Sequence, residues 1–198
     1  MKERVKHIVG IDEVGRGPLA GPVTICALAV RAEFDLSFFK GIRDSKKLSE
    51  KQRKEWLKKI KDKKVSGELH YFISSVGAEI IDRRGISWAV RRAIKNVIGK
   101  LPINPDESEV LLDGSLKAPK NFKNQKTIIR GDEKIPIISA SSIVAKVFRD
   151  KKMSRLHKRY PQYGFHIHKG YGTSAHYKAL KKHGLSPIHR RSFLKGFK

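Results

Sequence analysis

The fold is set by the stretch His7-Ile8-Val9-Gly10-Ile11-Asp12-Glu13-Val14-Gly15-Arg16-Gly17-Pro18-Leu19-Ala20-Gly21-Pro22. Its apolar start, His7 to Asp12, predicts a short buried strand. A second run, Pro22 to Arg31, is rich in Val, Thr and Ile and predicts another strand. The glycines and prolines between the two runs predict a loop, because they suit neither a strand nor a helix.

Outward from this stretch, hydrophobic periodicity predicts further helices and strands. We expect strands over residues 69–76, 110–113 and 126–130. We expect helices over 49–61 with a capping box of Ser49 and Gln52, two over 77–101 divided by Gly85, one over 139–159, and one capped by Thr173 and closed by Gly184. This order predicts an α/β fold with a mixed five-stranded sheet flanked by helices.

The composition changes near Asp150. Beyond it the chain is basic, rich in His and aromatic residues, and contains no further acid. We therefore expect a main domain over residues 1–150 and a small basic helical subdomain over residues 151–198.

The charge balance narrows the class of partner. Lys and Arg number 44 against 19 Asp and Glu, a net charge of +25 in 198 residues, which indicates a polyanionic partner. The longest mainly apolar run, Val23 to Val30, is far shorter than the ~20 residues that span a bilayer, so nucleic acid is favoured over membrane. The start, Met1 to His7, lacks the apolar core of a signal peptide, and the single Cys26 cannot form an internal disulfide. Both features predict a cytoplasmic protein.

Four acids stand next to apolar runs in this basic chain: Asp12, Glu13, Asp113 and Asp150. Carboxylates brought together at strand ends repel one another unless cations hold them. Oxygen-only ligands favour Mg²⁺ or Mn²⁺, and two such ions can activate water and stabilise the leaving oxygen of a phosphodiester.

Simpler roles stay open for each acid. Asp113 begins an Asp-Gly turn signal, Asp12 can cap a loop amide, and Asp150 can pair with Lys146 one helical turn away. Asp12 and Glu13 are adjacent and point to opposite faces of an ideal strand, so they share a site only where the strand ends or bulges.

The glycine loop is not a dinucleotide-binding loop. Its spacing, G-x-G-x-x-x-G, has one residue too many, and Pro18 and Pro22 preclude the helix that would bind pyrophosphate. Gly15-Arg16-Gly17 can still let the backbone approach a sugar-phosphate closely, or form a plain turn with a solvated Arg16.

Together these motifs resemble ribonuclease HII, the bacterial type 2 ribonuclease H. The resemblance covers nearly the whole chain and is carried by residues 10–22, Asp44-Ser45-Lys46-Lys47-Leu48-Ser49, Leu112-Asp113-Gly114, residues 140–150 and 163–173, and His189-Arg190-Arg191-Ser192-Phe193. The type 3 relatives usually lack the arginine in the glycine loop and carry an extra N-terminal domain. Arg16 is present here and only nine residues precede Gly10, so type 2 is preferred.

The resemblance implies a ribonuclease H-like fold and a metal-dependent endonuclease of DNA replication and repair, which cuts RNA paired with or joined to DNA. It implies that two Mg²⁺ or Mn²⁺ ions are held by the residues that match the family's quartet, Asp12, Glu13, Asp113 and Asp150. It implies substrate binding by Gly15, Arg16, Gly17, Lys46, Lys47, Ser141 and Tyr171, with the loop and Tyr171 recognising the 2′-hydroxyl at an RNA-to-DNA junction. We expect cleavage 5′ of single ribonucleotides, giving 3′-hydroxyl and 5′-phosphate ends.

Other predictions about ligands and partners rest on fewer residues. Lys46 and Lys47 precede a predicted helix start, where a phosphate can meet lysine and helix amides, but a solvated loop explains them as well. Six histidines follow residue 156 without a cysteine and at no zinc-finger spacing, so zinc is not favoured. No clamp-binding peptide with a Gln is visible near the C-terminus, so binding to a replication clamp is doubtful. A monomer is expected.

Three functions therefore compete: a type 2 ribonuclease H, another two-metal nuclease such as a junction resolvase, and a non-catalytic nucleic-acid-binding protein. The Gly-Arg-Gly loop with Tyr171 distinguishes the first from the second. The acid quartet distinguishes both nucleases from a passive binder, which has no use for carboxylates facing phosphates.

Overall fold

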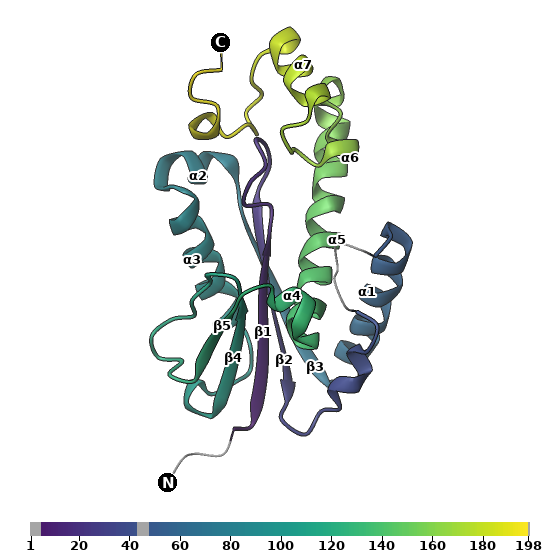
Figure 1. The fold of residues 1–198 in the computed structure, drawn as a ribbon, viewed down its shortest axis with the longest axis vertical. Coiled ribbons are helices and arrows are strands. Elements are labelled where there is room, and N and C mark those ends of the chain that lie inside the picture. Colours follow the sequence, from purple (N-terminus) through teal and green to yellow (C-terminus); the bar gives the residue numbers. More distant parts are fainter. Residues whose placement is uncertain (1–4, 43–47, 198) are drawn as a thin grey trace.

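Five strands form one sheet, and helices cover both of its faces (Figure 1). The computed structural model describes residues 5–42 and 48–197. The strands are β1 (His7–Val14), β2 (Val23–Arg31), β3 (Leu69–Val76), β4 (Ser108–Asp113) and β5 (Gln125–Ile128). The α-helices are α1 (Glu50–Val65), α2 (Ala78–Arg84), α3 (Ile86–Ile98), α4 (Gly131–Lys134), α5 (Pro136–Arg159), α6 (Phe165–His168) and α7 (Ser174–His183).

The sheet is mixed, as predicted, with the strand order β3-β2-β1-β4-β5. Strands β1, β2 and β3 are antiparallel neighbours, whereas β4 and β5 run parallel to β1. Alternate residues of β2 pack on opposite faces: Ile25 faces a core shared with α3, and Cys26 and Leu28 face a core shared with α1 and α5. Strand β2 is therefore buried on both sides, which explains its nearly continuous apolar sequence.

Helix α5 is fastened closely to β1. A Cβ atom on Gly10 would lie 2.4 Å from the carbonyl oxygen of Ile137, so only glycine allows this approach. The Ser141 hydroxyl donates a hydrogen bond of 2.8 Å to the Gly10 carbonyl from a fully buried position. Ser141 therefore joins helix to strand, and its side chain has no exposed surface for the expected contact with substrate.

Most predicted elements are confirmed, with shifted ends. The Ser49–Gln52 capping box forms, and Gly85 divides α2 from α3. Helix α5 starts three residues before the predicted Ser139, because Pro136 fits the first helical turn. Strand β5 stops at Ile128, and Arg130 adopts a positive φ of 56° that no strand permits. The one-turn helices α4 and α6 are too short for periodicity to reveal.

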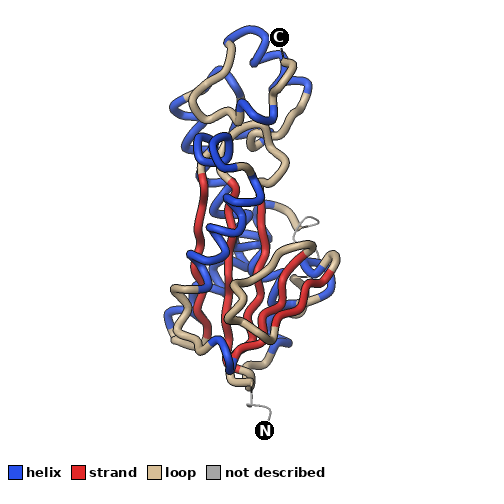
Figure 2. Tube along the Cα trace, turned by 90° about the vertical axis from the view of Figure 1, so that its left-hand side faces the viewer, coloured by secondary structure: helices blue, strands red, loops and turns tan. Residues whose placement is uncertain are grey.

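The chain after residue 150 packs at the end of the sheet toward which β1 points (Figures 1 and 2). Helix α5 runs without a break through residue 150, so the backbone shows no boundary there. Leu19 and Ala20 of the glycine loop belong to the same buried cluster as Phe165, Leu180 and Leu194. The glycine loop and the C-terminal segment are therefore one packed unit. In the described part of the chain, no helix is long and apolar enough to cross a membrane.

Three buried groups form a hydrogen-bonded chain within this unit. Nδ1 of His176 lies 2.9 Å from the Tyr171 carbonyl, so it carries a proton and donates. The Ser186 amide donates to Nδ1 of His189 at 2.8 Å, and the two Nε2 atoms are 3.0 Å apart. His189 therefore donates from Nε2 to His176, and both rings are neutral in this arrangement.

Lowering the pH is expected to destabilise the folded protein through this pair of histidines. Burial, with a smaller contribution from His176, lowers the pKa of His189 to about 4. The unfolded chain therefore binds a proton near pH 6.5, whereas the folded chain does not bind it until about pH 4. Stability is lost as the pH falls from about 6.5 to 4, by on the order of 3 kcal/mol. Urea unfolding of wild type and His189→Asn, whose side-chain oxygen can replace Nδ1 as the acceptor, should show a flatter pH dependence in the variant. Identical slopes would contradict this assignment.

Candidate active site

A cleft of about 540 Å³ opens where β1 and β4 end. Four carboxylates line it: Asp12 and Glu13 from β1, Asp113 from the last position of β4, and Asp132 from α4. The parallel strands β1 and β4 bring their carboxyl ends to the same edge of the sheet. The remaining lining residues are Val14, Gly15, Arg16, Gly17, Arg53, Ser142, Lys146 and Tyr171.

The adjacent residues Asp12 and Glu13 both reach this cleft without a bulge in β1. The antiparallel pairing with β2 continues regularly to Val14, whereas the pairing with β4 stops at Ile11. Beyond Ile11 one side of β1 has no neighbouring strand, which leaves room for both side chains. The strand itself neither bulges nor ends at these two residues, so the condition expected from the sequence is not met in that form; only the pairing with β4 has ended there.

Asp12 carries the largest electrostatic cost of the four acids. It is 4% exposed, and burial raises its pKa to about 8, with a further rise from the charge of Asp113. A hydrogen bond from Ser142 and one of 2.7 Å from the Glu13 amide act in the opposite direction. The folded protein therefore provides too little positive charge of its own to hold this carboxylate ionised at neutral pH.

Only one of the two carboxylate oxygens of Glu13 has a hydrogen-bond partner among the described residues. Its Oε1 accepts a hydrogen bond of 3.1 Å from Arg16, while its Oε2 is buried and has no partner among the described residues. Burial raises its pKa, and the bond from Arg16 lowers it in part. A buried carboxylate oxygen without a hydrogen-bond donor lowers the stability of the fold unless a cation or a substrate group binds to it.

Asp113 and Asp132 are joined through the backbone of α4. The Asp113 Oδ1 accepts hydrogen bonds from the amides of Gly131 at 2.7 Å and Asp132 at 3.3 Å. Asp132 is 2% exposed, and its charge contributes to the raised pKa of Asp12. Asp132 was not among the predicted acids; its sequence signal is weaker than that of Asp113, because Arg130 and Gly131 separate it from the apolar pair Ile128-Ile129.

Asp150 lies outside this cluster. It lines a separate groove between α1 and α5, and its carboxylate pairs with Lys146 at 2.9 Å, one helical turn earlier. Its side chain is 17% exposed, as expected for a residue at the edge of the core. The structure therefore brings together three of the four predicted acids, and Asp132 rather than Asp150 lines the cleft with them.

The acids fit divalent cations by their chemistry. No group of three or more His, Cys, Asp or Glu side chains within residues 5–42 and 48–197 is arranged to hold an ion as the side chains stand. The cleft nevertheless has four carboxylates and no His or Cys among its lining residues, a carboxylate with a strongly raised pKa, and a Glu13 Oε2 with no partner among the described residues. Hard cations such as Mg²⁺ or Mn²⁺ match this donor set.

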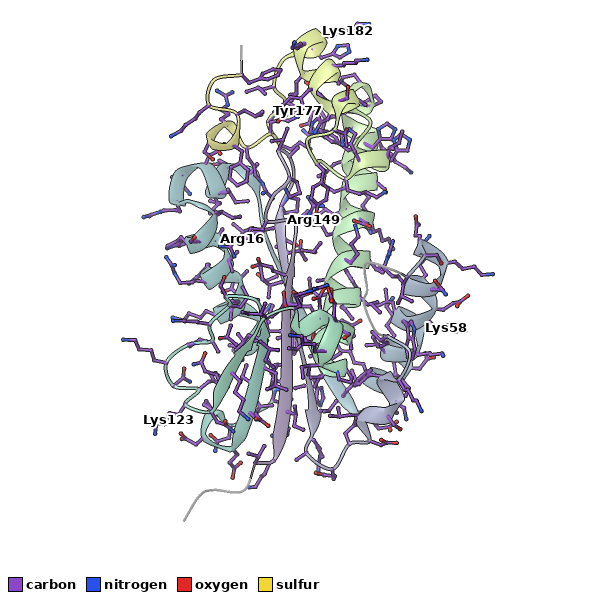
Figure 3. The ribbon with its side chains drawn as sticks, in the orientation of Figure 1. Arg16, Lys58, Lys123, Arg149, Tyr177 and Lys182 are labelled. Carbon is purple, nitrogen blue, oxygen red and sulfur yellow. The ribbon has the colours of Figure 1, made fainter. Side chains whose placement is uncertain are left out.

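Two buried arginines hold the glycine loop. Arg190 donates to the carbonyls of Gly15 at 2.6 Å, Arg16 at 2.7 Å and Gly21 at 3.0 Å. Arg149 donates to the Pro22 carbonyl at 2.9 Å, and it extends from α5 toward this loop (Figure 3). Both guanidinium groups are fully buried and no described carboxylate pairs with them.

The loop is shaped around these guanidinium groups. A Cβ atom on Gly15 would lie 2.0 Å from the Arg149 side chain, and its φ of 86° also favours glycine. Burial lowers the pKa of Arg190 to about 10, with the Arg149 charge as the next cause. The loop carbonyls turn inward to these cations, and the amides of Arg16 and Gly17 donate to no described residue. Both residues are exposed and line the cleft, so these amides can donate to solvent or to a ligand.

The other predicted contacts divide into two groups. Tyr171 lines the cleft, is 42% exposed and lies with its ring centroid 5.8 Å from the Arg149 guanidinium carbon. Lys46 and Lys47 fall outside the described residues. Arg53, Ser142 and Lys146 also line the cleft, and none of them is among the substrate-binding residues predicted from the sequence.

Known proteins resemble this chain over nearly its full length. The family model described as Ribonuclease HII matches residues 9–195. Ribonuclease HII of Coxiella burnetii is 44% identical over 186 residues, covering 94% of this chain and 87% of that protein. Ribonuclease HII of Acetivibrio thermocellus is 44% identical over 192 residues, covering 97% of this chain and 71% of that protein.

Solved structures agree with the predicted ribonuclease H-like fold. The ribonuclease H2 of Pyrococcus horikoshii superposes with a TM-score of 0.74 at 27% identity, covering 94% of this chain and 93% of that one. The Archaeoglobus fulgidus RNase HII, solved in a complex with PCNA, superposes with a TM-score of 0.78 at 23% identity, covering 96% and 95%. The chain therefore belongs to the ribonuclease HII family and is a metal-dependent endoribonuclease of the ribonuclease H type.

Proposed function

We propose that this enzyme hydrolyses the RNA strand of RNA–DNA hybrids and cuts duplex DNA 5′ of a single embedded ribonucleotide, leaving 3′-hydroxyl and 5′-phosphate ends. One observation carries the proposal: the four-acid cleft is bordered by the Gly15–Gly17 loop and by Tyr171. A nuclease site and a site that can read a ribose thus lie side by side. A non-catalytic binder of nucleic acid would not use four acids in one cleft of a basic protein.

We propose that Asp12, Glu13, Asp113 and Asp132 hold the divalent ions, with Asp150 outside the set. Such ions, when bound, polarise the phosphodiester and supply an activated water. The positively charged side chains of the cleft are proposed to bind the substrate rather than the metal ions. Lys146 and Arg53 line the same cleft and can contact phosphate oxygens, and Asp150 holds the Lys146 ammonium in place.

The loop provides selectivity in this proposal. Its free amides at Arg16 and Gly17 can bond a 2′-hydroxyl or an adjacent phosphate, which the inward-turned carbonyls do not obstruct. Tyr171 can stack on the neighbouring sugar or base and also bond the 2′-hydroxyl. A site built around such a bond leaves its polar groups unpaired on DNA, and such sites discriminate by ~10⁴ or more.

Matched duplexes with and without one 2′-hydroxyl test this function. Wild type, with Mg²⁺ or Mn²⁺, should cut the ribonucleotide-containing duplex and spare the all-DNA duplex. Tyr171→Ala should lose cleavage of the single-ribonucleotide duplex more than it loses overall affinity, because the ring contributes at the junction only. Tyr177→Ala, an exposed tyrosine of α7 that does not line the cleft, serves as the control. Equal cutting of both duplexes by wild type would refute the proposal.

Three expectations stay predictions for this chain: a monomer, a cytoplasmic location and the absence of clamp binding. The PCNA complex is a property of the Archaeoglobus protein. Gel filtration with a purified replication clamp would test the first and the third together.

A further inference from the structure

A second groove, of about 570 Å³, lies between α1 and α5. We call it the α1–α5 groove. Arg53 lines both this groove and the active-site cleft, so the two are neighbours on one side of the sheet. The groove is lined by Glu50, Arg53, Lys54, Leu57, Lys58, Lys61, Val147, Phe148, Asp150, Lys151, Ser154 and Lys169.

The charge of this groove is strongly positive. Six of its side chains are Lys or Arg and two are acids. Both acids are already paired, Glu50 with Lys54 at 2.6 Å and Asp150 with Lys146 at 2.9 Å. Lys58 and Lys151 are exposed and make no ion pair with any described acid. Their charges are available to an anionic ligand.

The walls of the groove also include apolar surface. Leu57 from α1 and Val147 and Phe148 from α5 line it, and Phe148 is 37% exposed. The Lys61 ammonium lies 6.0 Å from the Phe148 ring centroid, so a cation and an aromatic face are presented together. A nucleic-acid strand offers this combination of partners, because its phosphates suit lysines and its sugars and bases suit an aromatic ring.

We propose that the α1–α5 groove binds the sugar–phosphate backbone of the duplex on one side of the cleaved bond. The inference rests on the proposed function, since it assigns the groove to the same nucleic acid that enters the cleft. Continuity through Arg53 supports this, because Arg53 lines both the cleft and the groove, and Lys58 lines the groove farther along α1. Figure 3 shows Lys58 on α1, the helix that faces α5.

The salt dependence of binding tests the proposal. Lys58→Ala/Lys151→Ala is compared with Lys95→Ala/Lys100→Ala, whose lysines are exposed on and just after α3, on the other face of the sheet. Affinity for an RNA–DNA hybrid of about 20 base pairs is measured by fluorescence anisotropy in EDTA, which prevents cleavage. Each lost phosphate contact reduces the slope of log K against log salt by about 0.9. The groove variant should lose about 1 to 2 in slope and the α3 variant much less; equal slopes would overturn the proposal.

Truncated duplexes distinguish a defined site from general attraction. The groove lies beside the cleft, so shortening the duplex on one side of the cleavage position should remove the difference between wild type and the groove variant. Shortening it on the other side should leave that difference unchanged. A difference that persists on both truncated duplexes would overturn the proposal.

The two proposals fail in different ways. Wild type that binds hybrids through Lys58 and Lys151 but cuts none would refute the function and leave the groove intact. Wild type that cuts, with a groove variant that keeps the full salt slope, would refute the groove alone.

Discussion

Asp132→Asn is expected to reduce metal-dependent cleavage of a hybrid by several orders of magnitude, about 10³-fold or more, while the fold is retained. Asp132 is buried in the cleft beside Asp12 and Asp113, so a carboxamide there removes one negative ligand from the proposed metal site. The change is nearly isosteric. The Asp132 amide that bonds Asp113 belongs to the backbone and is kept. Single-turnover cleavage at saturating Mg²⁺ or Mn²⁺ measures the effect.

Asp150→Asn is the matched control. Asp150 lines the adjacent groove and its carboxylate pairs with Lys146, so we expect the activity of Asp150→Asn to be at least about 100-fold higher than that of Asp132→Asn. A readout independent of cleavage is the thermal midpoint, which Mn²⁺ should raise in wild type and Asp150→Asn and raise far less in Asp132→Asn. The reverse ranking of the two variants would restore Asp150 to the metal site.

Arg190→Lys should impair selectivity for ribose as well as stability. The guanidinium makes three hydrogen bonds, to the carbonyls of Gly15, Arg16 and Gly21, and an ammonium cannot reach all three in that geometry. Breaking such a buried network costs about 3 kcal/mol, and the freed carbonyls can turn toward the cleft. The amides that are proposed to read the 2′-hydroxyl then lose their fixed direction.

The expected result is a fall in the ratio of affinities for duplexes with and without one 2′-hydroxyl, together with a lower free energy of unfolding. Arg191→Lys is the control, because its side chain is exposed and its only described contact to the neighbouring Asp82 is through the backbone amide. A purely structural role for Arg190 would lower stability and leave the ratio of affinities unchanged in the folded fraction, and this outcome would contradict the positioning role.

The sequence determined the elements whose signals are local. Strand β3 has the predicted bounds because its apolar run is flanked by turn residues, and α1 begins at its predicted cap because Ser49 and Gln52 interact within one turn. Asp12, Glu13 and Asp113 were found because they end apolar strands, and parallel neighbours end at a shared edge. Their role as metal ligands of a nuclease was inferred from the resemblance to the family.

Only the tertiary structure decided which fourth acid joins them. Asp132 precedes α5 on a one-turn helix, and its position depends on how the chain turns after β5, where Arg130 takes a positive φ. Asp150 lies far along α5, and each residue rotates a side chain by about 100°, so its direction depends on how that helix packs on β1. That packing turns Asp150 toward α1 and Lys146.

The support of the glycine loop was likewise decided by tertiary structure. Arginine is rarely buried, so a sequence pattern gives Arg149 and Arg190 no reason to be core residues. Both arginines are buried because the loop of residues 15–22 turns its carbonyls inward to accept their hydrogen bonds. Arg190 reaches the Gly21 carbonyl from 169 residues further along the chain. A short-range pattern identifies the strand, the loop and the acids; contacts distant in sequence determine how these are assembled into a site.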